Sequence, residues 1–138
     1  MEKKYFDLAF IYAIAAMIGG VFYREFTKWN QFTGTTALGK VHTHLFFLGM
    51  LLFLLIALFS KSMNFEKQKT FRNFMKIYNI GLPILSVMMA VRGVIQVLGI
   101  EISRGASFAI SGVAGIGHIM VGTGIILLLI AFKKSANE

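Results

Sequence analysis

The three histidines of this 138-residue chain all lie inside apolar stretches. His42 and His44 lie at the start of GKVHTHLFFLGMLLFLLIALF, which covers residues 39–59, and His118 is flanked on both sides by long runs of apolar or small residues. An ionisable side chain in such a segment is costly to bury in a membrane, so each histidine is a candidate functional group.

The spacing of the histidines argues against a zinc or copper site. A His-x-His pair chelates one ion from a β-strand, but residues two apart on a helix point about 200° apart. His42 and His44 therefore cannot easily hold one small ion, and no carboxylate lies deep within the apolar segments as a further ligand. Haem needs only one histidine from each of two helices, one on each face of the ring. The chain has no cysteine, which excludes covalent attachment through C-x-x-C-H, so the pattern favours non-covalent, bis-histidine haem b.

Depth in the membrane distinguishes His42 from His44 as candidate iron ligands. His118 lies 15 residues before Lys133, a rise of about 22 Å, and His44 lies 17 residues before Lys61, a rise of about 25 Å. The same measure gives about 28 Å for His42. Depth therefore favours His44 as the iron ligand opposite His118.

The residues around His42 leave it as an alternative to His44 for the iron ligand on this helix. Gly39, Phe46 and Gly49 share its face at i−3, i+4 and i+7, which forms a slot like the one around His118. Because His42 and His44 point to opposite sides, His42 could also bind a second haem.

Small and basic residues complete the candidate haem site. Ser111, Gly115 and Gly122 share one helical face with His118, and glycine clears room for a flat macrocycle. Arg92 is an arginine inside an apolar segment and needs an anion, which the haem propionates would supply. Secondary candidates for the propionates are Arg24, Lys28 and Lys40.

Four apolar segments predict the fold. The chain is 57% hydrophobic with a mean hydropathy of +0.72, and each segment meets the roughly 20 residues needed to cross a bilayer as a helix. We predict one all-α domain over residues 1–138, an antiparallel bundle of four transmembrane helices at 5–26, 38–59, 77–100 and 106–132. Part of the polar loop 60–76 is expected to continue the third helix, and Pro83 is expected in that helix's first turns.

The net charge of +8 is distributed unevenly. Nine basic residues fall on one side of the predicted topology and four on the other, so the positive-inside rule predicts cytoplasmic termini and a cytoplasmic 60–76 loop in a bacterial cell membrane. The charge then attracts anionic lipid rather than nucleic acid. The nine are Lys3, Lys4, Lys61, Lys67, Lys69, Arg72, Lys76, Lys133 and Lys134.

Two stretches resemble known families. VHTHLFFLGML resembles the haem-ligating second helix of the main subunit of haem–copper oxidases and nitric oxide reductases, which would favour His42. The longer GGVFYREFTKWNQFTGTTALGKVHTHLFFLGM, together with GHIMVGTG, is similar to a family of small four-helix bacterial membrane proteins, formerly of unknown function. Some members of that family are linked to haem stress and haem tolerance, so the resemblance implies haem handling.

The expected function is haem sequestration or tolerance. With histidine on both axial positions no site is open for oxygen, which argues against peroxidase or oxygenase chemistry. Two alternatives remain: a membrane cytochrome b that takes electrons from quinol, and a transporter or its accessory subunit. The sequence also leaves open whether the chain forms a homo-oligomer.

Overall fold

The computed structural model describes residues 2–137, and this part of the chain is helical without a β-strand. Four helices are long and apolar enough to span a membrane. The predicted all-α bundle of four transmembrane helices is therefore confirmed. Its elements are α1 (Glu2–Trp29), α2 (Leu38–His44), the π-helix η1 (Leu45–Leu51), α3 (Leu52–Phe59), the 3₁₀ turn η2 (Phe65–Lys67), α4 (Lys69–Leu98) and α5 (Arg104–Ser135). The elements α2, η1 and α3 follow one another without a break and form the second span.

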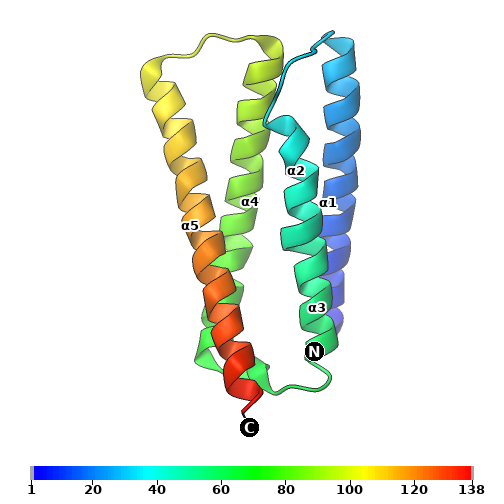
Figure 1. Ribbon diagram of the computed structural model, residues 1–138, viewed down its shortest axis with the longest axis vertical. Coiled ribbons are helices and arrows are strands. Elements are labelled where there is room, and N and C mark those ends of the chain that lie inside the picture. Colours follow the sequence, from blue (N-terminus) through cyan, green and yellow to red (C-terminus); the bar gives the residue numbers. More distant parts are fainter. Residues whose placement is uncertain (1, 138) are drawn as a thin grey trace.

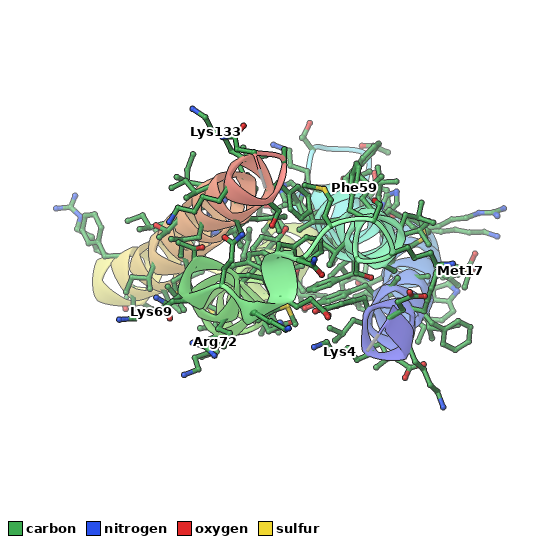
Figure 2. All side chains as sticks on the ribbon, turned by 90° about the horizontal axis from the view of Figure 1, so that it is seen from below. Lys4, Met17, Phe59, Lys69, Arg72 and Lys133 are labelled. Carbon is green, nitrogen blue, oxygen red and sulfur yellow. The ribbon has the colours of Figure 1, made fainter. Side chains whose placement is uncertain are left out.

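The helices run antiparallel, and both ends of the chain lie at one end of the bundle with the connection between α3 and α4 (Figure 1). Figure 2 looks at this end, where Lys4, Lys69, Arg72 and Lys133 come from three different helices. The predicted grouping of basic residues at one end is thus present in the fold.

Two helix pairs form the bundle. The α2–η1–α3 span packs along α1, while α5 packs along α4. The pairs meet at both ends: near the termini the rings of Phe59 and Phe132 are 5.3 Å apart, and toward the opposite end Leu38 of α2 packs against Gly93 of α4. Toward the opposite end α5 leans away from α2, as both views show (Figures 1 and 2).

Glycines allow α4 and α5 to approach closely. A Cβ atom on Gly124 would lie 2.7 Å from the ring of Tyr78, and one on Gly81 would lie 2.6 Å from the Cβ atom of Met120. Small residues of this kind let membrane helices gain van der Waals contact where no hydrophobic driving force exists. The α4–α5 interface is therefore fixed by glycine positions.

The third span begins earlier than predicted. The helix α4 starts at Lys69, eight residues before the predicted start at 77, so the expected continuation of the helix into part of the 60–76 loop is confirmed. The extension forms because Phe71 and Phe74 bury one face of it, and the Gln68 side chain donates hydrogen bonds to α5. Pro83 consequently lies in the middle of α4, and its predicted place in the first turns was wrong.

The π-helix η1 was not predicted. It starts directly after His44 and covers Leu45–Leu51. Its Gly49 lies against the Tyr12 ring of α1 with no room for a side chain. Because π-helical turns are rare and often occur at functional sites, η1 directs attention to the histidine beside it.

Substitutions at two glycines of α5 test the packing between α4 and α5. Gly124→Leu should destabilise the bundle by about 1–3 kcal/mol, because the new side chain collides with Tyr78. Gly112→Leu is the matched control, since a Cβ there meets no atom of residues 2–137 within 4 Å. Thermal unfolding in detergent measures both variants. Equal melting temperatures would contradict the assigned interface.

Candidate functional site

His44 and His118 share one local geometry. The Nδ1 atom of His44 lies 2.9 Å from the carbonyl oxygen of Lys40, and that of His118 lies 2.9 Å from the carbonyl oxygen of Ala114. A carbonyl oxygen only accepts, so Nδ1 donates in both rings, and in the neutral imidazole the unprotonated nitrogen is then Nε2. Each ring is thus oriented by its own helix and presents a lone pair on Nε2, the state in which histidine binds a metal.

The face of α5 that bears His118 is turned toward the α2–α3 span. Phe132 lies 14 residues after His118, which places the two about 40° apart around the helix. Phe132 packs against Phe59 of α3. The side chain of His118 is exposed in the bundle, so it is accessible from this side.

His44 borders a hollow on the side of the α2–α3 span that faces α5. The hollow has a volume of about 220 Å³ and is lined by Thr43, His44, Phe47 and Leu48. The carbonyl oxygen of Leu48 accepts a 2.8 Å hydrogen bond from the Tyr78 hydroxyl. The Tyr78 ring in turn lies against Gly124 of α5. The hollow therefore adjoins the place where the two helix pairs meet.

Two close contacts on α4 give the relative heights of α2 and α5. Leu38 of α2 lies against Gly93, and Gly117 of α5 lies against Leu85. Gly93 and Leu85 are eight residues apart on α4, a rise of about 12 Å.

These contacts bring His44 and His118 to similar heights. His44 lies six residues beyond its reference contact and His118 one residue beyond, so their heights differ by about 5 Å. His42 differs from His118 by about 8 Å on the same measure. The order matches the depth estimate made from the sequence.

The small residues around His118 leave its face open. A Cβ added to Gly115 or Gly122 would have no neighbour within 4 Å in the described part of the chain. Gly117 and Gly124, by contrast, are filled by α4. The glycines of α5 thus divide into two sets, one that packs against α4 and one that flanks His118.

Arg92 reaches from α4 to the same face of α5. Its Nη2 atom donates to the Ser111 hydroxyl at 2.6 Å and to the Ser107 carbonyl at 3.1 Å, and Nη1 donates to the Ser107 hydroxyl at 3.3 Å. Ser111 is seven residues before His118, about 10 Å along the helix. The structure therefore brings Arg92 and Ser111 together on the His118 side.

The secondary basic candidates are separated. Lys40 is exposed and lies one turn before His44 on the same face of α2. Arg24 lies on α1, where its Nε atom is 3.8 Å from Glu25 and its side chain is 81% exposed. Of these two residues, Lys40 lies beside His44. Arg24 is exposed and lies near Glu25, the next residue of its own helix.

His42 faces α1 instead. Its ring lies 6.3 Å from that of Tyr23 at an interplanar angle of 18°, and its buried Nδ1 has no hydrogen-bond partner among the described residues. The glycine slot noted in the sequence is occupied, because Tyr23 fills the space at Gly39 and Tyr12 the space at Gly49. The slot around His42 therefore serves the α1–α2 interface.

The histidines do not form a multidentate metal site. Within residues 2–137, no three His, Cys, Asp or Glu side chains are grouped so that they could hold a metal ion.

Three residues near His44 were not predicted from the sequence: Thr43, Leu48 and Tyr78. Their types are ordinary in an apolar helix, so only the fold shows that Thr43 and Leu48 line the hollow beside His44 and that Tyr78 donates to the carbonyl of Leu48.

Residues 2–135 match the model of a family described as "Protein of unknown function (DUF2871)". The chain belongs to the DUF2871 family. The match spans all four long helices, and both His44 and His118 fall inside it. No curated protein and no solved structure matches the chain. The DUF2871 description gives no activity, so function must be argued from the site.

Proposed function

We propose that this protein binds one haem b non-covalently between α2 and α5, with His44 and His118 as axial ligands, and sequesters it within the membrane. The observation that supports this most directly is the matched pair of Nδ1 hydrogen bonds to the carbonyls of Lys40 and Ala114. A hydrogen bond of this kind fixes the ring and raises the basicity of Nε2 toward a metal.

The open faces suit a flat, apolar ligand. The leaning of α5 away from α2 separates the two histidine-bearing faces at the end away from the termini (Figure 1). Gly115 and Gly122 present no side chains on the α5 side, and a hollow of about 220 Å³ adjoins His44 on the other. A porphyrin needs such cleared surface on both sides of its plane.

Basic groups near this opening suit the propionates. Arg92 is held at the Ser111 level, and only three of its five N–H donor positions are needed for the hydrogen bonds it makes. Lys40 lies one turn from His44. A carboxylate at this end would gain charge-assisted hydrogen bonds in a poorly solvated site.

A bis-histidine site favours retention over catalysis. Haem so bound supplies an iron that can exchange electrons but has no open coordination position. The residues of this chain would hold the ligand, orient both imidazoles and keep water from the ring. Haem sequestration and tolerance follow as the physiological role.

We further propose that the protein lies in the bacterial cytoplasmic membrane with both termini in the cytoplasm. Basic residues gather at the end that bears the termini (Figure 2). Positive charge at this end favours its retention on the cytoplasmic side.

The histidines can be distinguished spectroscopically. The purified protein should bind about one hemin per chain with a low-spin, six-coordinate spectrum. His44→Ala and His118→Ala should each abolish six-coordination, and added imidazole should restore it by filling the vacated position. His42→Ala is the matched control and should keep a low-spin spectrum. A colourless protein that also fails to take up hemin would refute haem binding, and loss of the low-spin form only in His42→Ala would transfer the ligand role to His42.

Arg92 can be tested by the rate of haem loss. Arg92→Leu should speed transfer of hemin to a haem-free globin acceptor by about 10–100-fold, since a hydrogen bond to a charged group is worth about 1.5–3 kcal/mol. Arg24→Leu is the control, because Arg24 lies on α1 outside the site. Unchanged transfer from Arg92→Leu would show that the arginine does not hold a propionate.

The absence of native cysteine allows orientation to be measured directly. Ser62→Cys and Thr33→Cys place single exposed thiols in the two opposite loops. A membrane-impermeant maleimide should label Thr33→Cys in intact cells and Ser62→Cys only after the membrane is opened. The reverse pattern would place the termini outside.

A further inference from the structure

A second open hollow lies between the second span, α1 and α4, and shares none of its lining residues with the His44 hollow. It has a volume of about 300 Å³ and is bounded by α1, by the start of the second span and by α4. Val87, which is 54% exposed, stands at its edge, so the groove opens onto the membrane-facing surface. Its walls include Ala15, Val41, Leu45 and Ala90.

Two hydroxyl-bearing side chains, Tyr12 and Ser86, line this otherwise apolar groove, and the Oγ atom of Ser86 lacks a hydrogen-bond partner among the described residues. Ser86 is only 7% exposed, lines the groove, and its Oγ atom makes no hydrogen bond within residues 2–137. A serine inside a helix commonly donates to the carbonyl oxygen three or four residues earlier, but Ser86 does not. An unpaired hydroxyl in apolar surroundings is unfavourable, so a ligand atom that accepts a hydrogen bond would be stabilised here.

The depth of Ser86 restricts the kind of ligand. Ser86 lies 17 residues into α4 from Lys69 and 12 residues before Leu98, well inside the span. Lipid acyl chains carry no polar atom at this depth. No Asp, Glu, Lys or Arg lines the groove among the described residues, so the ligand should be neutral.

We propose that this groove binds the ring of a membrane quinone, with a quinone carbonyl accepting a hydrogen bond from the Ser86 hydroxyl, whose enclosed Oγ atom turns about χ1 into the groove when the ligand binds. A quinone combines a flat apolar body, solubility in the bilayer and a neutral carbonyl acceptor. The site lies within one helix diameter of His44, about 10 Å, because Val41 and Leu45 of the second span form its inner wall. Quinone binding here is independent of haem binding at His44.

The probe is 2,3-dimethyl-1,4-naphthoquinone, and its control is 2,3-dimethylnaphthalene, which lacks the carbonyls. Equilibrium dialysis against the full chain in lipid nanodiscs, with empty nanodiscs as background, measures retained probe. The parent should show saturable binding of about one quinone per chain. Ser86→Ala should weaken it about threefold to tenfold, the effect of one neutral hydrogen bond. Ala90→Leu should abolish it by filling the groove.

Thr123→Val is the matched control, because it removes a hydroxyl from an exposed position on α5. Its binding should equal that of the parent, and the naphthalene should not distinguish parent from Ser86→Ala. Circular dichroism checks that Ala90→Leu remains helical, and the absorption spectrum of the same samples reports haem content separately. Retention by the parent equal to that of empty nanodiscs, or unchanged binding in Ser86→Ala, would overturn the proposal.

Discussion

A chain within a bilayer must satisfy its polar groups from its own atoms, because the hydrocarbon offers no hydrogen-bond partner. Most of this protein's architecture follows from that constraint. His44 and His118 donate to their own helices, Arg92 donates to two serines of α5, and Tyr78 donates to the second span. The polar atoms left without partners are therefore informative. Ser86 lines a groove, whereas the unpaired Nδ1 of His42 is enclosed against α1.

Small residues serve two opposite purposes in α5. Gly117 and Gly124 allow close approach to α4, and a side chain at either position would collide with Leu85 or Tyr78. A Cβ at Gly115 or Gly122 would meet no described atom within 4 Å, so these positions leave a bare surface beside His118. One helix can thus be tightly held on one side and open on the adjacent side. A rigid scaffold of this kind fixes the direction in which His118 is presented.

Much of the fold could be predicted from composition, because long apolar segments in a membrane have few structural options. The second span was predicted at residues 38–59, and the structure has it at the same bounds. The predicted start of α4 at residue 77 came eight residues late, because Phe71 and Phe74 are separated by polar residues and hydropathy alone does not register an amphipathic helix end. The face shared by Ser111 and His118 was foreseeable from helical periodicity. Which glycines pack and which stay open was not, since that depends on the angle between α4 and α5.

The π-helix after His44 determines how the residues before it are rotated relative to the residues after it. A π-helical stretch accommodates an extra residue in a helix without unwinding it. The wider π turns carry these seven residues through about the same rotation as six residues of a regular helix, so loss of one residue from Leu45–Leu51 would leave the flanking residues in nearly their present orientation. If all seven residues instead formed a regular helix, everything before them would turn by about 100° relative to everything after them. His44 would then leave the side facing α5 while Phe53 and Ile56 kept their buried positions, so the π-helical geometry itself sets the orientation of His44.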